Sequence, residues 1–401
     1  MRRARWSVPC VVIALTAVAC GEETVRTADQ DPGLLAPAPD GDKGQPLGNP
    51  VVDDAPRDTP TGPQADTSGG PSQGSCAAGK RACGAVCVTL ASDSRNCGAC
   101  GHSCLLGQCA NSQCQAFGFV GGLRALGSIH ADSENVYWTD AGQLFMSNKT
   151  GNVVTKLALT GATSAKVIAS DDKAVYFYDT DNATFGRTSR TEVATTTLFA
   201  APKFRGAFKT FREDMYWAER SETSSEDRIL TGTTKGGEVS LAAMSPTTVR
   251  EMAVDAKHVY WTTVDGRVLR SSRFGGCATS QCVETIARDQ AGAGSVTVDS
   301  THVYWANEKT GVVVRANKET LAMEAFVSGR GKPGNLTVDY GGVYFTVEGT
   351  NGRTEIAKGL LSGDGVIVLG TSAHPVGNIA VDATAIYWTD RTDGVIHKLA
   401  K

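Results

Sequence analysis

The residues with the clearest chemical potential in this chain are eight cysteines that fall within 39 residues. They are Cys76, Cys83, Cys87, Cys97, Cys100, Cys104, Cys109 and Cys114. An even number at this density is typical of a small exported module held by disulfides, because so short a segment buries too little apolar surface to fold without them. Zinc is the alternative, since Cys97 and Cys100 form a C-x-x-C pair and His102 follows closely. An oxidising compartment favours disulfides, and the sequence does not determine how the cysteines pair.

Two further cysteines, Cys277 and Cys282, stand far from this cluster and are separated by four residues. This spacing suits a disulfide that clamps a tight loop between neighbouring strands, provided that the two Cα atoms lie within about 7 Å. A redox-active pair is the alternative. Because loops on rigid scaffolds often carry function, a loop stiffened in this way is a candidate part of a binding surface.

Other reactive side chains do not form a known catalytic motif. The chain has no H-E-x-x-H motif, no P-loop, and no G-x-S-x-G or dinucleotide-binding glycine motif next to a strand. His258 and His302 both lie two residues before a repeated Tyr, which indicates a role in a turn. The segment from Tyr178 to Asn182 loosely matches calcium ligands, but it lacks the EF-hand pattern, so we expect solvated turn residues. We predict no catalytic residue, no metal site and no cofactor.

The N-terminus predicts export. Arg2, Arg3 and Arg5 precede an apolar run from Val8 to Val18, which suits a secretory signal and is too short to span a bilayer. The run ends in Ala17-Val18-Ala19-Cys20, which resembles the lipobox of bacterial lipoproteins. This resemblance implies removal of the signal peptide (1–20) and lipidation of Cys20. An ordinary signal peptide with a chance cysteine is the alternative.

A compositional break follows the signal peptide. Residues 21–75 hold nine of the fourteen prolines, ten acidic residues against three basic ones, and no aromatic residue. This composition predicts a disordered tether. The net charge of −3 then divides into +3 for residues 1–20, −7 for residues 21–75 and +1 for the remainder. A nearly neutral folded part argues against nucleic acid as a partner.

An internal repeat defines the elements that would position any site. A Tyr followed by an aromatic residue recurs seven times, and the tyrosines lie 39, 40, 44, 44, 40 and 43 residues apart. This period is typical of one four-stranded propeller blade per repeat. An Asp five residues before the Tyr marks a turn between strands in six repeats, at Asp132, Asp171, Asp255, Asp299, Asp339 and Asp382. The third repeat has Phe211 there, so we expect a differently capped turn.

We therefore predict an all-β fold, a seven-bladed propeller of four-stranded blades over residues 115–401, preceded by the tether (21–75) and a disulfide-rich module (76–114). The last repeat, from about Asn378 to Lys401, holds only three strands. The segment from Gln115 to Val120 is the predicted fourth strand, and it would close the ring without leaving an open sheet edge. Six blades with additional strands are the alternative.

The repeats resemble the YWTD repeats, which are the class B repeats of low-density-lipoprotein receptors. The match is full at Tyr137-Trp138-Thr139-Asp140 and Tyr387-Trp388-Thr389-Asp390, and Tyr260-Trp261-Thr262 keeps three positions. The resemblance implies that the aromatic pair packs between blades, that Thr and Asp tie strands together, and that no catalytic residue comes with the motif. The residues with these implied structural roles are Tyr137, Trp138, Asp140, Tyr176, Tyr216, Trp217, Tyr260, Trp261, Tyr304, Trp305, Tyr344, Tyr387, Trp388 and Asp390.

Three functions are compatible with these features. We expect a monomeric binding lipoprotein of the cell envelope that presents the propeller to a protein or glycan ligand, with the lipid on Cys20 as its contact with the membrane. We expect it at the outer membrane, on the periplasmic side or the cell surface, because Gly21 gives no signal for retention at the inner membrane. A lyase-like or lactonase-like propeller enzyme acting on a polysaccharide or a small ester is one alternative. An assembly component of the envelope is the other.

Overall fold

The computed structural model describes residues 76–401, apart from residues 160, 162, 163, 172, 193, 223, 224, 277, 278 and 350. The predicted signal peptide and tether, with Cys20, lie outside the described residues. The described part is built from β-strands and one short 3-10 helix, η1 (Ser280–Cys282). Among the described residues, no helix has the length and apolar character that a membrane crossing requires.

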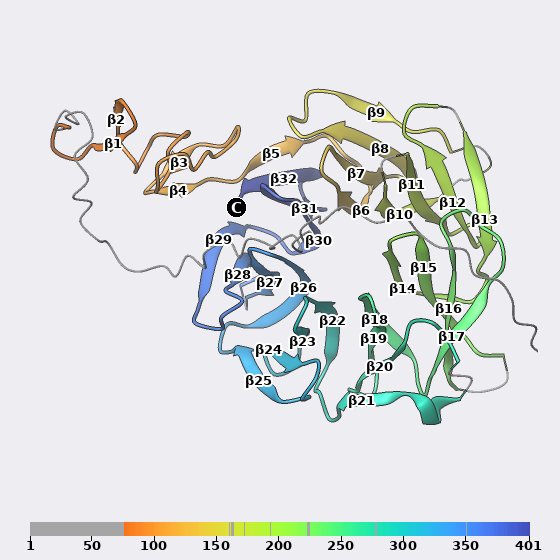
Figure 1. The fold of residues 1–401 in the computed structure, drawn as a ribbon. Helices are drawn as coiled ribbons and strands as arrows, with labels where there is room; N and C mark the ends of the chain where they lie inside the picture. Colours follow the sequence, from red (N-terminus) through yellow and green to blue (C-terminus); the bar gives the residue numbers. More distant parts are fainter. Residues whose placement is uncertain are drawn as a thin grey trace, which may run out of the picture. The chain divides into compact units, whose positions relative to one another are not determined.

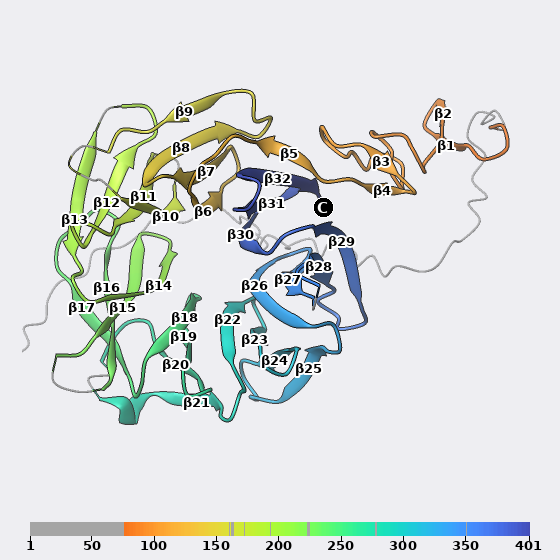
Figure 2. The ribbon, with the colours of Figure 1, turned by 180° about the vertical axis from the view of Figure 1, so that it is seen from behind.

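Seven antiparallel sheets of four strands each follow one another around a ring, as Figures 1 and 2 show from opposite sides. The prediction of a seven-bladed propeller is confirmed. From the inner to the outer strand, blade 1 contains β6 (Leu126–Ala131), β7 (Asn135–Asp140), β8 (Gln143–Asn148) and β9 (Val154–Lys156), and blade 2 contains β10 (Ala165–Ser170), β11 (Ala174–Asp179), β12 (Thr184–Ser189) and β13 (Thr195–Ala200). In the same order, blade 3 contains β14 (Phe204–Phe211), β15 (Asp214–Arg220), β16 (Asp227–Thr233) and β17 (Ser240–Ser245), blade 4 contains β18 (Val249–Val254), β19 (His258–Thr263), β20 (Val268–Ser272) and β21 (Glu284–Ala287), and blade 5 contains β22 (Ala293–Val298), β23 (His302–Asn307), β24 (Val312–Asn317) and β25 (Met323–Val327). Blade 6 contains β26 (Lys332–Asp339), β27 (Gly342–Glu348), β28 (Thr354–Gly359) and β29 (Val366–Ser372), and blade 7 contains β30 (Val376–Val381), β31 (Ala385–Asp390), β32 (Val395–Ala400) and β5 (Phe117–Val120).

The ring closes by pairing the two ends of the propeller in one sheet. Strand β5, which precedes blade 1 in the chain, is the outer strand of blade 7 and pairs antiparallel with β32. The partners are Ile396 with Val120, His397 with Gly118, and Lys398 with Phe117. The Phe119 side chain is only 7% exposed, and its ring lies 5.4 Å from the ring of Tyr387. The predicted closing strand is therefore confirmed.

The repeated aromatic pair forms the core between blades. The second strand of each blade has neighbouring sheets on both sides, so its Tyr and the following aromatic residue are both buried. Six of the seven tyrosines pack toward the next blade. Tyr260, for example, lies in one apolar cluster with Val303 and Trp305, whereas Tyr176 lies in a cluster with residues of its own blade. Burial of such a side chain contributes roughly 1.5–3 kcal/mol, so each blade depends on its neighbours for stability.

The repeated Asp joins the turn to this core. In blade 5, Oδ1 of Asp299 accepts hydrogen bonds from the backbone N–H groups of Thr301 and His302, and Oδ2 accepts one from the Tyr304 hydroxyl at 2.8 Å. Asp132, Asp171, Asp255 and Asp382 make the same contacts in their blades. One carboxylate thus caps a turn and fixes a buried Tyr.

Blade 3 replaces this arrangement, as its Phe211 predicts. Phe211 pairs directly with Asp214 across a tight turn in which Arg212 has a φ of 56°. The Tyr216 hydroxyl accepts a hydrogen bond from Nη1 of Arg273, which belongs to blade 4, and the same Nη1 lies 2.8 Å from Asp214. An arginine of the next blade therefore takes the place of the missing carboxylate.

A cation crosses from one blade to the preceding one at five of the seven junctions. Each follows the third strand of its blade, and we call these residues the junction cations: Lys149 with Asp382, Arg190 with Asp132, Arg273 with Asp214, Lys318 with Asp255, and Lys401 with Asp339. Lys318 Nζ lies 2.6 Å from Asp255. Although desolvation alone would raise the pKa of Asp255, hydrogen bonds from Lys318 and the turn backbone lower it to about 2. Thr234 and Leu360 directly follow the third strands of the other two blades.

The disulfide-rich module contains two short hairpins, β1 (Arg81–Cys83) with β2 (Val86–Val88) and β3 (Cys109–Ala110) with β4 (Gln113–Cys114). It leads directly into the closing strand and packs on blade 7. Buried Cys97, Cys104 and Cys114 share an apolar cluster with Trp388 and Leu399. The ring of His102 lies between the backbone oxygens of Cys97 and Lys401, at 2.6 and 2.9 Å.

Replacing Phe119 by Ala should destabilise the propeller by about 3–5 kcal/mol, because it removes the side chain that packs the closing strand onto blade 7. Chemical denaturation of the purified protein measures this change. Leu106→Ala is the matched control, since Leu106 is 61% exposed and its loss should change stability by no more than about 0.5 kcal/mol. Equal unfolding midpoints for Phe119→Ala and wild type would contradict a structural role for β5.

Candidate functional site

The seven inner strands surround a central channel with a cavity of about 570 Å³. Every inner strand contributes to its lining, and each is the edge strand of its sheet. Unpaired backbone N–H and C=O groups of edge strands point away from their sheets, which here is toward the channel. A cavity of this size with polar walls lies in the range of small-ligand sites. Figure 1 shows the propeller viewed along the channel, with the inner strands β6, β10, β14, β18, β22, β26 and β30 around the centre.

A recurring bulge supplies the polar side chains of the lining. The register shifts where the inner strand pairs with the second strand in all seven blades. In four blades the bulge contains Gly followed by Ser or Asn, at Gly127-Ser128, Gly294-Ser295, Gly334-Asn335 and Gly377-Asn378. All four polar residues of these pairs line the channel.

The Thr of the YWTD motif holds this bulge in place. Oγ1 of Thr389 accepts a hydrogen bond from the backbone N–H of Asn378 at 3.0 Å, and Thr139 does the same for Ser128 at 3.1 Å. The glycine is required for close approach, since a β-carbon at Gly377 would lie 2.7 Å from Oγ1 of Thr389. The motif residue in the second strand thereby aims a polar side chain of the first strand into the channel.

The charged residues of the channel are predominantly basic. Lys166, Lys209 and Arg391 line the cavity together with one carboxylate, Glu251. Lys209 Nζ lies 3.5 Å from Glu251, so this pair is internally neutralised. Lys166 and Arg391 are exposed near the end of the channel where the inner strands begin. We call this end the mouth; it is bordered by the loops between second and third strands and by the links between blades.

His130 is a neutral hydrogen-bonding group in the channel. Its ring stacks on Tyr137, with centroids 6.2 Å apart and an interplanar angle of 25°. Desolvation lowers the pKa of His130 from 6.5 to about 4, against a smaller opposing effect of Asp132. At neutral pH the imidazole therefore offers one donor and one acceptor and adds no charge.

Aromatic side chains form one wall of the channel, at blades 2 and 3. Tyr178, Phe204 and Phe208 all line the cavity, and the rings of Tyr178 and Phe204 lie 4.4 Å apart. The Tyr178 hydroxyl donates a hydrogen bond to the backbone oxygen of Ala201 at 3.2 Å, which fixes its ring. The channel thus combines an apolar wall with basic residues on blades 2, 3 and 7 and with hydroxyl and amide side chains on blades 1, 5, 6 and 7.

The predicted turn residues lie outside the channel. His258 and His302 are half-buried beside Tyr260 and Tyr304, with ring centroids 5.8 and 6.0 Å apart. Asp179 differs from the expectation of a solvated residue, since it is only 1% exposed. Its carboxylate accepts hydrogen bonds from the backbone of Asp181 and from Nδ2 of Asn182, so it caps the loop from within.

Asp140 and Asp390, the last residues of the two full YWTD motifs, bind backbone groups. Oδ1 of Asp140 accepts from the N–H groups of Arg124 and Ala125, at 2.9 and 2.7 Å, and ties the first blade to the closing segment. Asp390 caps its own loop and lies 2.9 Å from Nδ1 of His374, which is 3.5 Å from Asp393. The ligand atoms of these three side chains lie within 4.8 Å of one another, a spacing compatible with one shared cation.

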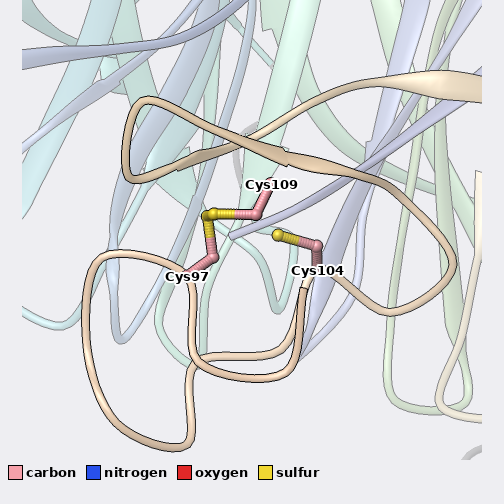
Figure 3. A group of neighbouring side chains, drawn as sticks. All are labelled: Cys97, Cys104 and Cys109. Carbon is pink, nitrogen blue, oxygen red and sulfur yellow. A yellow bond between two sulfur atoms is a disulfide. The ribbon is translucent and has the colours of Figure 1, made fainter. Parts of the chain in front are cut away.

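The sulfur atoms of the module are all joined in disulfides. The pairs are Cys76–Cys87, Cys83–Cys100, Cys97–Cys109 and Cys104–Cys114. Figure 3 shows Cys97 bonded to Cys109, with Cys104 beside them. This state leaves no thiolate in the module for the zinc alternative. Cys282 is also disulfide-bonded, whereas Cys277 lies outside the described residues.

Sequence reasoning missed the channel lining and the junction cations. The recurring Gly-Ser or Gly-Asn pair, five and four residues before the turn Asp, was a readable signal for the lining. The junction cations stand 12 to 14 residues after the repeated Tyr, as in Tyr137 with Lys149 and Tyr304 with Lys318. By contrast, Lys166, Lys209, Glu251 and His130 do not repeat between blades, so only the closed ring shows that they share a cavity.

Comparison with known proteins supports the fold. No protein-family model matches this sequence. No curated protein matches it either. Among solved structures, the chain is similar to PorZ, a surface component of the type-IX secretion system of Porphyromonas gingivalis, with a TM-score of 0.55, 11% identity, and coverage of 71% of this chain and 39% of PorZ. It is also similar to a puromycin-hydrolysing peptidase of Mycobacterium tuberculosis, with a TM-score of 0.53, 12% identity, and coverage of 68% of this chain and 52% of the peptidase.

A weaker likeness is to a chain of a nidogen–laminin complex, with a TM-score of 0.39, 16% identity, and coverage of 51% of this chain and 80% of that one. At these identities the comparisons show a propeller fold alone. The chain spans less than two thirds of the length of PorZ and of the peptidase.

His130 and His374 lie in contrasting environments, so their imidazoles should titrate at clearly different pH values. We expect His130 to titrate near pH 4, because it is desolvated, and His374 above pH 6.5, because its hydrogen bond to Asp390 raises its pKa. Imidazole NMR signals followed against pH measure both midpoints, with His130→Gln and His374→Gln for assignment. Since the unfolded chain takes up a proton on His130 near pH 6.5 and the folded chain only near pH 4, the free energy of unfolding should fall as the pH drops between these values. A His130 midpoint near 6.5 would contradict a desolvated ring.

Proposed function

We propose that this protein is an exported, lipid-anchored binding protein whose propeller holds its ligand at the mouth of the central channel. The observation that carries this proposal is the lining of the channel, where amide and hydroxyl side chains from bulges on four blades converge with basic residues. A rigid ring of this kind presents fixed hydrogen-bonding groups at little cost in ordering, which favours recognition.

The balance of charge favours an anionic group on the ligand. With Lys209 paired to Glu251 and His130 neutral, Lys166 and Arg391 remain as the charges available at the mouth. Arginine and lysine make their strongest hydrogen bonds to carboxylate or phosphate oxygens. An acidic residue of a protein or an acidic sugar of a glycan would pair with these cations, while Ser128, Ser295, Asn335 and Asn378 would form hydrogen bonds with its neutral polar groups.

The channel supports recognition better than catalysis. A general base has to be oriented and within reach of its acid or nucleophile. Glu251 is engaged with Lys209, and among the described residues His130 makes no hydrogen bond to a carboxylate that would orient it. The groups that converge are those that hold a ligand.

The sequence supports delivery to the envelope. The lipobox-like Ala17-Val18-Ala19-Cys20 would place acyl chains on Cys20, and the Pro-rich segment 21–75 would separate the propeller from the membrane. A binding protein on such a tether reaches ligands in the space around its anchor.

Replacing both Lys166 and Arg391 by Glu should weaken ligand capture at least about tenfold, because a hydrogen bond to a charged group contributes roughly 1.5–3 kcal/mol. Affinity capture with the mature protein from envelope and extracellular fractions identifies the ligand, and titration against it at two salt concentrations measures the loss. Arg288→Glu is the matched control, since Arg288 is exposed on a link at the same face and does not line the channel. Full capture by the double variant would show that the ligand binds elsewhere.

Replacing Cys20 by Ser should release the protein from membranes or block its processing, because the acyl chains that anchor it can no longer be attached. Membrane fractionation and the intact mass of the mature protein test this expectation. Cys10→Ser, within the signal peptide, is the control and should leave both unchanged. The lipid anchor would be contradicted if Cys20→Ser associated with membranes as the wild type does and the wild-type chain carried no acyl mass.

A further inference from the structure

We propose that the face of the propeller opposite the mouth carries a second binding site, a groove across blades 3 to 6 that takes a neutral polysaccharide chain. This face is formed by the turns between first and second strands and the loops between third and fourth strands, and we call it the turn face. The proposal does not depend on the function assigned to the channel, because no residue that the argument uses lines the channel.

Two neighbouring cavities form the groove. The larger, about 630 Å³, lies between blades 4 and 5 and is lined by Phe211, Tyr260, Arg270 and Lys318 among others. The smaller, about 360 Å³, lies between blades 5 and 6 and is lined by Val338, Tyr340 and Leu361 among others. The turn at residues 299–301 lines both cavities, so the two lie next to each other on either side of this turn of blade 5.

Exposed aromatic rings stand at the two ends of this groove. Phe274, in the loop after β20, is 74% exposed, and Tyr340, in the first turn of blade 6, is 82% exposed. No other Phe, Tyr or Trp among the described residues is a large exposed hydrophobic residue. Tyr340 lines the smaller cavity, and Phe274 lies on the same face beside Arg273, which also contacts Phe211 of the larger cavity.

One face of the Phe274 ring packs on the guanidinium group of Arg273. The guanidinium carbon of Arg273 lies 4.3 Å from the centre of the Phe274 ring and 5.1 Å from that of Phe211, which lines the larger cavity. Hydrogen bonds from Arg273 to Asp214 and Tyr216 fix the guanidinium. The outer face of the Phe274 ring is thereby offered to solvent in a defined orientation, as a stacking platform.

Three cations of the groove are neutralised by ion pairs within the protein. Lys318 is paired with Asp255, Arg270 with Glu284, and Lys401 beneath Tyr340 with Asp339. Three further charged side chains of the lining, Asp299, Lys257 and Glu319, form no ion pair among the described residues. The Asp299 carboxylate is instead held by hydrogen bonds from the backbone N–H groups of Thr301 and His302 and from the Tyr304 hydroxyl. The groove therefore offers aromatic platforms, hydroxyls and one hydrogen-bonded carboxylate, and it has no excess of positive charge that would select an acidic chain.

This chemistry fits an uncharged sugar chain. The CH faces of sugars stack on aromatic rings, and their hydroxyls suit the polar groups of Ser300, Thr301 and Asn317 that line the groove. Packed sheets lie about 10 Å apart, so rings on the loops of blades 4 and 6 are separated by more than one sugar unit. An extended polysaccharide can reach both rings, whereas a monosaccharide cannot. A protein partner would require one continuous apolar centre, which two exposed rings on loops of separate blades do not provide.

Native affinity electrophoresis of the full mature chain tests the proposal, with hydroxyethylcellulose, laminarin, glucomannan and arabinoxylan as neutral polysaccharide probes. We expect at least one of them to retard the wild-type protein. Phe274→Ala and Tyr340→Ala should each weaken this retardation about tenfold, which is the loss of one stacking contact. Tyr340→Phe keeps the ring and should keep the binding. Val153→Ala is the matched control, because Val153 is 56% exposed on a turn-face loop of blade 1, outside the groove.

Failure of this proposal is distinct from failure at the channel. The Lys166→Glu and Arg391→Glu double variant should be retarded like wild type, since its substitutions lie at the mouth. The proposal is overturned if no neutral probe retards the wild-type chain, or if Phe274→Ala and Tyr340→Ala bind as tightly as Val153→Ala. The proposal is also overturned if Phe274→Ala and Tyr340→Ala keep their polysaccharide binding but no longer capture a protein from envelope fractions that the wild type captures. That result would show that the groove binds a protein. Unchanged thermal unfolding of both variants excludes misfolding as the cause of any loss.

Discussion

The propeller depends on the contact between the aromatic pair of one blade and that of the next. A single four-stranded sheet of this chain has no core of its own, because its second strand is apolar on both faces and needs a sheet on each side. Tyr260 with Trp305 and Tyr304 with Phe345 are two instances of one packing arrangement that recurs at six of the seven junctions. Between blades 2 and 3, Trp217 packs instead against Phe185 and Phe199. Such a chain of contacts has no natural end, so the ring has to close. The strand that precedes blade 1 achieves this by pairing with β32.

Polar contacts follow the same path from blade to blade. The turn Asp binds its own Tyr, and the junction cation of the next blade binds that Asp, as Lys318 does with Asp255. A partly buried carboxylate that meets both a hydroxyl and a cation has hydrogen-bond partners within the interface, as packed interfaces require. In blade 3, a cation of the next blade is still joined to the repeated Tyr although the turn Asp is absent. Arg273 bonds directly to Tyr216 where Phe211 has replaced the Asp.

The sequence predicts features that repeat and leaves open those that do not. Seven Tyr-aromatic pairs at an even step were enough to predict the blade number, and a three-stranded last repeat was enough to place the closing strand near Phe119. The deviating turn at Phe211 was also visible, because a broken pattern marks its own position. The YWTD resemblance implied that Thr ties strands together, and Thr389 does so by holding a bulge.

The candidate site could not be predicted in the same way. Lys166, Lys209, Glu251 and His130 each occur once, on different blades, and nothing in their local sequence shows that they meet. Their proximity is a property of the closed ring, as is the desolvation that lowers the pKa of His130. The groove on the turn face has the same origin, since Phe274 and Tyr340 lie in unrelated loops. Disulfide pairing was equally undetermined, because any close set of cysteines permits several connectivities.

The position of the disulfide-rich module has a mechanical consequence. In a chain held at its N-terminus and loaded at its propeller, tension passes through the module into β5, whose pairing with β32 rests on a few residues. Four disulfides make the module inextensible, so it transmits force without yielding. Its packing against Trp388 and Leu399, with His102 beside the Lys401 backbone, diverts part of that force into the body of blade 7. Under such a load, the module would therefore reduce the force on the hydrogen bonds between β5 and β32.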